Sequence, residues 1–161
     1  MHCRASTSFP IEQKEQIFQM IKALNHTGFV VSDRDAAVAF YRDIVGLRVI
    51  SKYGRRGSGV DQVVGYDGTE LKSAVLDIGK GHILELIQYI KPEPQPRPSS
   101  ERNVMGAAHL ALEVDDIHET FDQLVNGGAQ ALNPPAELAP GRIGCYLQDP
   151  DGNWLELLQL D

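Results

Sequence analysis

The chain has 161 residues, of which 42% are hydrophobic, and 22 acidic against 15 basic residues give a net charge of −7. This length suits one compact domain or two small modules that share a core, and the acidic balance argues against a protein that binds nucleic acid through phosphate contacts. No apolar run is long enough for a membrane span, and Cys3 and Cys145 form no disulfide framework. We therefore expect a cytoplasmic protein.

The first predicted element lies within residues 1–24. Ile11, Phe18 and Leu24 recur at roughly helical spacing, which predicts an amphipathic helix over Ile11–Leu24 after a short irregular tail. This helix precedes the first of two similar modules.

Residues 25–90 are predicted to form the first module. A strand is expected at Asn25–Val31, followed by a helix whose N-cap is Ser32 or Asp33 and which ends at Gly46. The strands expected after it are Leu47–Tyr53, Gln62–Tyr66, Glu70–Ile78 and His82–Ile90.

Residues 91–105 are predicted to be a linker. Lys91–Ser100 holds four of the nine prolines of the chain, a composition that favours an extended connector over a sheet strand.

Residues 106–161 repeat the pattern of the first module. A strand is expected at Ala107–Val114 and a helix from Asp115 or Asp116 to Val125. The strands expected after that helix are Ala129–Leu132, Ile143–Gln148 and Trp154–Leu160. Apart from one extra strand in the first half, both halves indicate a β-α-β-β-β unit, which predicts an α+β fold built from an internal repeat.

Two histidines and two glutamates occupy equivalent places in the two halves. His26 and His109 lie near the start of the first strands, while Glu85 and Glu156 lie in the last strands, within LELIQ and LELLQ. Because strand side chains alternate between faces, all four are expected on the face of each sheet that the helix does not cover.

A shared cation would offset the cost of placing two carboxylates in strands so rich in leucine and isoleucine. Two neutral imidazoles and two carboxylates balance a divalent charge, so His26, Glu85, His109 and Glu156 are the predicted metal ligands. Nitrogen and oxygen donors without a thiolate are compatible with Ni, Co, Zn, Mn or Fe.

With this pattern the sequence resembles the vicinal oxygen chelate superfamily, the group of glyoxalases, bleomycin resistance proteins and dioxygenases. The resemblance covers about residues 25–160 and is carried by four segments: His26–Leu47, His82–Tyr89, His109–Val114 and Asp149–Gln159. It implies a curved mixed sheet that forms a cup around a metal ion, a small-molecule substrate, a homodimer, and ligands at the four positions named above.

The set His-Glu-His-Glu is similar to that of bacterial glyoxalase I, and methylmalonyl-CoA epimerases usually carry glutamine at the position of Glu85. The resemblance thus implies a lyase or isomerase of the lactoylglutathione lyase type that stabilises an enediolate formed from an α-carbonyl substrate. Thr27–Val31 holds no basic residue where glyoxalase I carries an arginine for glutathione. This departure argues against glutathione specificity and keeps an acyl-CoA epimerase open.

For such a reaction Glu156 is the expected base and Glu85 the alternative. Substrate contacts are expected from Arg48, Arg55, Arg142 and Tyr146. Two other functions on the same scaffold stay open: an extradiol-type dioxygenase, and a metal-free protein that binds small molecules and confers resistance.

Overall fold

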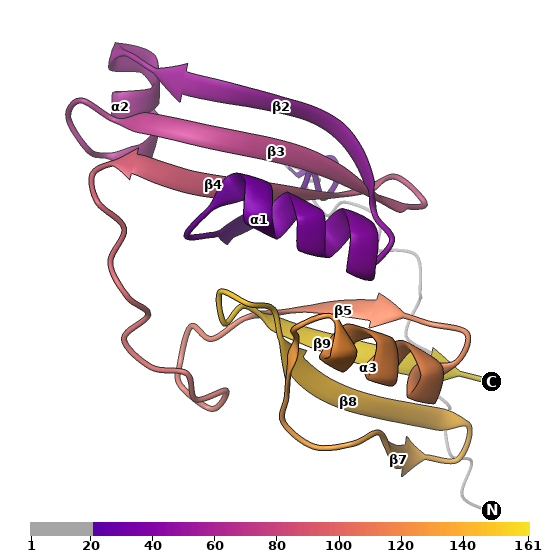
Figure 1. Cartoon of the computed structure of the whole chain (residues 1–161). Coiled ribbons are helices and arrows are strands. Elements are labelled where there is room, and N and C mark those ends of the chain that lie inside the picture. Colours follow the sequence, from indigo (N-terminus) through magenta and orange to yellow (C-terminus); the bar gives the residue numbers. More distant parts are fainter. Residues whose placement is uncertain (1–20) are drawn as a thin grey trace, which may run out of the picture.

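The computed structural model describes residues 21–161. The predicted helix Ile11–Leu24 therefore lies outside the described residues except for 21–24, which have no regular secondary structure. Figure 1 shows two units, one above the other, each with a sheet and at least one helix. No helix of residues 21–161 is long and apolar enough to cross a membrane.

The first unit is a sheet of four strands in the order β1-β4-β3-β2. Its strands are β1 (Thr27–Val30), β2 (Arg48–Arg56), β3 (Glu70–Gly79) and β4 (His82–Lys91). Only β1 and β4 pair in parallel, and the other pairs are antiparallel. Between β1 and β2 the chain forms helix α1 (Arg34–Ala39), which continues as one π-helical segment, η2 (Phe40–Ile44).

The predicted N-cap of this helix is confirmed at Asp33. Its carboxylate accepts hydrogen bonds from the backbone N–H groups of Asp35 and Ala36, both at 2.8 Å, and so satisfies donors that have no partner inside the helix. Gly46, at φ +87°, ends the segment as predicted.

The strand predicted at Gln62–Tyr66 is wrong, because Gln62–Val64 form the end of a short helix, α2 (Ser58–Val64), which Gly65 and Tyr66 follow. The valines of the segment favour a strand by propensity, but glycines bound it on both sides, and Gly65 adopts φ +79° as the helix C-cap. The Asp61 carboxylate accepts from the backbone N–H groups of Gly68 and Thr69 at 3.2 and 2.7 Å. Local capping therefore outweighs strand propensity here.

The second unit repeats the first with a sheet of five strands in the order β5-β9-β8-β6, in which β7 also pairs with β8. Its elements are β5 (His109–Glu113), α3 (Ile117–Asn126), β6 (Gln130–Ala131), β7 (Ala136–Ala139), β8 (Arg142–Gln148) and β9 (Trp154–Leu160). Asp116 is the N-cap of α3. Strand β7 is not among the predicted strands. Its four residues are all exposed, so the segment lacks the alternation of apolar and polar residues that indicates a half-buried strand.

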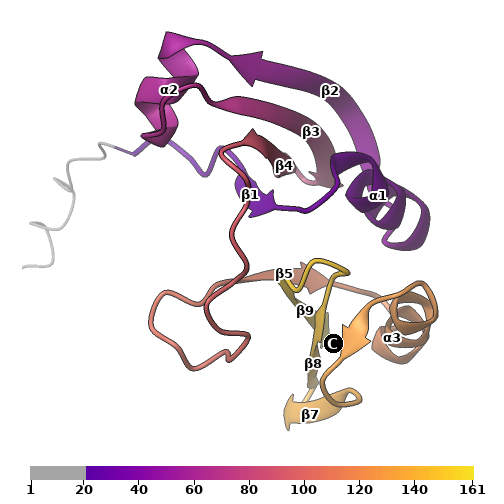
Figure 2. The same ribbon diagram turned by 60° about the vertical axis from the view of Figure 1, so that its left-hand side comes forward.

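Helix α1, with its continuation η2, and helix α3 lie next to each other on the same side of the molecule (Figure 2). The Gln123 side chain at the end of α3 donates to the backbone oxygen of Ile44 at 2.6 Å, and Gly127 lies so close that a methyl group there would stand 2.2 Å from Ile44 Cγ2. One hydrophobic core extends through both units. Its fully buried leucines are Leu76, Leu84, Leu86, Leu124, Leu147, Leu155 and Leu157.

A buried polar network also joins the units. The side chain of Asp149, 1% exposed, lies in the turn between β8 and β9 and accepts a hydrogen bond from the Tyr41 hydroxyl at 2.9 Å. Asn153 donates to the same carboxylate at 2.9 Å and contacts the backbone oxygen of Val30 at 3.3 Å. The turn after β8 thereby fixes how the second unit sits against β1 and η2.

Candidate metal centre

The first histidine and glutamate predicted as ligands are brought together at the edge of the first sheet. His26 directly precedes β1, and Glu85 stands on the neighbouring strand β4, in register with Gly28. The distance from His26 Nε2 to Glu85 Oε2 is 3.2 Å, with the imidazole 42% and the carboxylate 12% exposed. An accessible nitrogen thus faces a mostly shielded carboxylate.

The second histidine and glutamate form the same arrangement in the second sheet. His109 begins β5, and Glu156 lies on β9, in register with Ala111. His109 Nε2 is 3.1 Å from Glu156 Oε2, and the two side chains are 43% and 14% exposed. The geometry of the two pairs agrees to within a tenth of an ångström and a few per cent of exposure.

The faces of the strands are as predicted. Leu84 and Leu86 on β4 are completely buried in the core, whereas Glu85 between them is only partly buried. Leu155 and Leu157 on β9 flank Glu156 in the same way. Since neighbouring strand residues point to opposite faces, both glutamates project from the face that α1 and α3 leave uncovered.

The structure does not bring the four predicted ligands into one cluster. Among residues 21–161 no group of three or more His, Cys, Asp or Glu side chains is close enough to hold one metal ion. Each unit instead carries half of the predicted site, which we call the first half-site (His26 and Glu85) and the second half-site (His109 and Glu156).

Each half-site fits two neighbouring positions around a divalent metal. Two ligands at right angles with bonds of about 2.1 Å lie about 3.0 Å apart. The observed separations of 3.2 and 3.1 Å match this value. The donors, an imidazole nitrogen and a carboxylate oxygen in each half-site, suit Zn, Ni, Co, Mn and Fe.

A tyrosine that the sequence did not indicate stands beside the first half-site. The Tyr53 hydroxyl on β2 donates to Glu85 Oε1 at 2.5 Å, reaching across β3, where the small Ser73 is its partner in register. Burial, followed by this hydrogen bond to Glu85, raises the pKa of Tyr53. The Glu85 carboxylate is thereby held at both oxygens, by Tyr53 and by His26.

The predicted substrate residue Tyr146 lies at the second half-site. It is in register with Glu156 across β8 and β9, and its ring meets that of His109 edge to face at 5.2 Å between centroids. Burial and then the charge of Glu156 raise the pKa of Tyr146. The half-sites thus share a phenol next to the carboxylate, although the two tyrosines come from different strands of their sheets.

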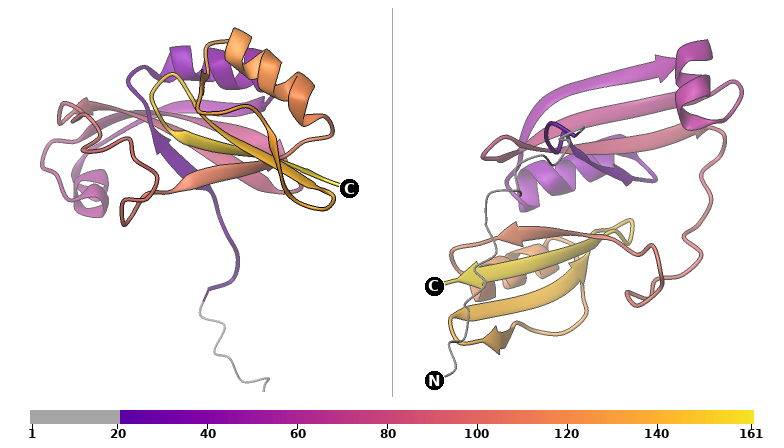
Figure 3. Two further views of the ribbon diagram at one scale, coloured as in Figure 1. Left: turned by 90° about the horizontal axis from the view of Figure 1, so that it is seen from below. Right: turned by 180° about the vertical axis from the view of Figure 1, so that it is seen from behind.

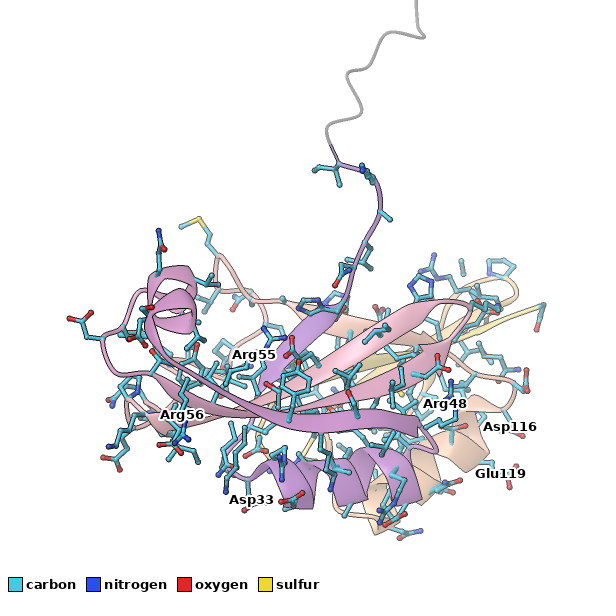
Figure 4. All side chains as sticks on the ribbon, turned by 90° about the horizontal axis from the view of Figure 1, so that it is seen from above. Asp33, Arg48, Arg55, Arg56, Asp116 and Glu119 are labelled. Carbon is cyan, nitrogen blue, oxygen red and sulfur yellow. The ribbon has the colours of Figure 1, made fainter. Side chains whose placement is uncertain are left out.

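The three arginines predicted to contact substrate have different positions. The Arg55 guanidinium lies over the Tyr53 ring at 4.8 Å and so belongs to the first half-site. Arg48 stands at the opposite end of β2 from Arg55 (Figure 4) and forms an ion pair with Asp77 at 2.5 Å. Arg142, at the start of β8, lies four residues before Tyr146 and is exposed. Only Arg55 therefore joins a half-site.

Comparison with known families decides the class of protein. The family model for the glyoxalase/bleomycin resistance protein/dioxygenase superfamily matches residues 23–157. The chain belongs to this superfamily. Its βαβββ repeat and the uncovered faces of its two sheets are thus features of a glyoxalase-superfamily fold.

Relatives of this superfamily member include named enzymes. It is 30% identical over 138 residues to a probable lactoylglutathione lyase of Synechocystis sp., covering 84% of this chain and 94% of the relative. It is 28% identical to a 2-epi-5-epi-valiolone epimerase of Actinomyces sp., over 86% of this chain and 79% of the relative. A solved glyoxalase family protein of Bacillus cereus has the same fold, with a TM-score of 0.80 and 20% identity over 87% of this chain and 95% of that one.

Proposed function

We propose that this protein is a divalent-metal-dependent lyase or isomerase that moves a proton on a carbon next to a carbonyl group. The observation that supports this proposal most strongly is the pair of matched half-sites, with His Nε2 to Glu Oε2 separations of 3.2 and 3.1 Å. An isolated histidine and glutamate on a sheet has many structural explanations. Because the same geometry occurs in both repeats, we infer that the two histidine–glutamate pairs bind the same kind of ligand, a metal ion.

The proposed metal site is completed by a second copy of the chain. Within one chain the two half-sites do not come together as one cluster of ligands. Each nevertheless presents an accessible imidazole on an uncovered sheet face. A two-fold dimer that places the first half-site of one copy against the second half-site of the other forms two equivalent centres. Each centre then has two histidines and two glutamates, which balance a divalent charge.

In this centre His26, Glu85, His109 and Glu156 hold the metal. A bound divalent metal would supply a Lewis acid for the negative charge that develops on the substrate oxygens. Tyr53 keeps Glu85 oriented through its hydrogen bond at 2.5 Å. Glu156 is the proposed base: once released from the metal, its carboxylate takes the proton from the substrate carbon and returns it. Its neighbour His109, 3.1 Å away, helps Tyr146 and Trp154 to line a cavity of about 210 Å³. A base must stand within hydrogen-bond reach of the carbon acid, and this cavity provides space for the substrate there.

Isosteric substitution to glutamine distinguishes the roles of Glu85 and Glu156. With saturating metal, Glu156→Gln is expected to lower kcat by about 10²- to 10⁴-fold, because it removes the base. Glu85→Gln is expected to raise the metal concentration needed for half-maximal activity and to lower kcat less. Turnover of hemithioacetals and of 2-methylacyl-CoA thioesters, measured across a metal titration, tests both variants. The opposite ranking of the two kcat values would assign the base to Glu85, and turnover that requires oxygen would contradict the isomerase proposal.

A further inference from the structure

Arg102 is held at the second half-site by the connector between β4 and β5. Figure 3 shows this connector leaving the end of β4 and running outside the sheets before it reaches β5. Its path is fixed by the Trp154 indole N–H, which donates to the backbone oxygen of Ser100 at 3.2 Å, and by Arg97, which donates to Asn153 Oδ1 at 3.2 Å. Arg102 is thereby placed with its guanidinium 4.6 Å above the Trp154 ring.

The Arg102 guanidinium borders a small cavity next to the second half-site. The cavity measures about 210 Å³ and is lined by Arg102, Ala107, Ala108, His109, Tyr146 and Trp154. Cavities of about 150 Å³ hold a benzene molecule, so this one accepts a compact group of several heavy atoms. Because the lining combines small alanines, two aromatic rings and one cation, the cavity suits a small anion attached to a short carbon chain.

Among residues 21–161 no carboxylate forms an ion pair with Arg102. Within residues 21–161 the ion pairs of arginine are Arg34 with Asp35, Arg42 with Asp43 and Arg48 with Asp77, and Arg102 takes part in none. The stacking leaves the edge of the guanidinium, which carries the N–H donors, available to a ligand.

The first half-site carries a similar arginine. Arg55 lies over the ring of Tyr53 at 4.8 Å, and its Nη2 donates to the Tyr53 hydroxyl at 3.1 Å. In the proposed centre the two glutamates cancel the charge of the metal, so the charges of Arg55 and Arg102 are left over. A site with surplus positive charge favours an anionic substrate.

We propose that Arg102 binds a carboxylate of the substrate, so that the substrate class is a compact carbonyl compound with a carboxylate a few bonds from the reacting carbon. This inference rests on the proposed function, because it assumes that the carbonyl oxygens bind at the metal. Arg102 meets the carboxylate with two parallel N–H donors, the geometry that a planar guanidinium offers. It thereby determines specificity and orients the reacting carbon next to Glu156.

Two hydroxamates that bind divalent metals through two oxygens, as an enediolate does, test this inference. Acetohydroxamate has no further charge, and succinic acid monohydroxamate adds a carboxylate. We expect the metal-loaded full chain to bind the carboxylate probe about 10- to 100-fold more tightly in calorimetry, the range of a charge-assisted hydrogen bond. Arg102→Gln is expected to reduce this preference to within about twofold, and Arg102→Lys to retain part of it.

Arg42→Gln is the matched control, because it removes an exposed arginine of η2 that is paired with Asp43; it is expected to keep the full preference. Equal binding of both probes by the unaltered protein, or an undiminished preference in a folded Arg102→Gln variant, would overturn the role of Arg102 and leave the metal site standing. If neither probe binds the metal-loaded chain, the proposed function itself is wrong, and this inference is wrong with it.

Discussion

His109→Ala is expected to remove bound metal and to lower turnover at least about a hundredfold. The imidazole is the more exposed donor of the second half-site, and its Nε2 lies 3.1 Å from Glu156, so its loss leaves the carboxylate with no nitrogen partner on its own unit. His26→Ala is expected to act equally, because the first half-site has the same geometry. For protein purified without chelators, we expect about one metal per chain in the unaltered form and less than about 0.2 in either variant.

His82→Ala and His118→Ala are the controls for this experiment. His82 is exposed at the start of β4, and His118 lies in the first turn of α3; neither belongs to a half-site. Both variants are expected to keep the metal content and turnover of the unaltered protein. A His109→Ala variant that retains its full metal content would show that the second half-site is not a ligand pair.

Asp149→Ala is expected to lower the free energy of unfolding by about 3 to 4 kcal/mol, because it breaks a buried network. The carboxylate accepts from the backbone N–H groups of Asn153 and Asp151 at 2.7 and 3.0 Å, in addition to the Tyr41 hydroxyl and the Asn153 amide. Its removal leaves several buried donors without an acceptor. Tyr41→Phe removes one donor and is expected to cost about 1 kcal/mol. Urea unfolding at one fixed protein concentration measures both.

The pH dependence of the same measurement tests the environment of Asp149. Burial raises the pKa of this carboxyl above its ordinary value of 3.8, so the folded state binds the proton more readily than the unfolded state does. The contribution of Asp149 to stability is therefore largest below pH 3.8 and decreases as the pH rises through the raised pKa. The free energy of unfolding of the unaltered protein minus that of Asp149→Asn is therefore expected to decrease as the pH rises from 3.8 through the raised pKa. A difference that grows with pH would contradict this account.

The features of the fold that could be predicted from the sequence depend on local patterns. Caps such as Asp33 and Asp116 act within a few residues, and the alternation around Glu85 and Glu156 follows from the period of a strand. The repeat also let the positions of His26 and His109 be matched. The strand predicted at Gln62–Tyr66 also rests on a local pattern, and it is wrong. Strand propensity takes no account of the turn at Gly68 and Thr69, whose N–H groups donate to the Asp61 carboxylate.

The parts of the candidate site that could not be predicted depend on tertiary contacts. Tyr53 reaches Glu85 only because β3 lies between their strands with Ser73 at the crossing point. Arg102 belongs to a connector whose composition indicates no structure, and its position follows from the bond between Trp154 and Ser100. The equivalence of the repeats predicts four ligands around one ion but does not say whether one chain or two supply them; within one chain the half-sites lie apart.

Mixing two inactive variants tests the central claim, that a metal centre joins half-sites from two copies. A chain with His26→Ala keeps its second half-site, and a chain with His109→Ala keeps its first. When the two are unfolded together and refolded as an equal mixture, half of the dimers are mixed, and each mixed dimer has one intact centre of two. We predict that metal content and turnover both recover to about a quarter of the values of the unaltered protein. A mixture that forms dimers but remains without metal and without activity would contradict the account.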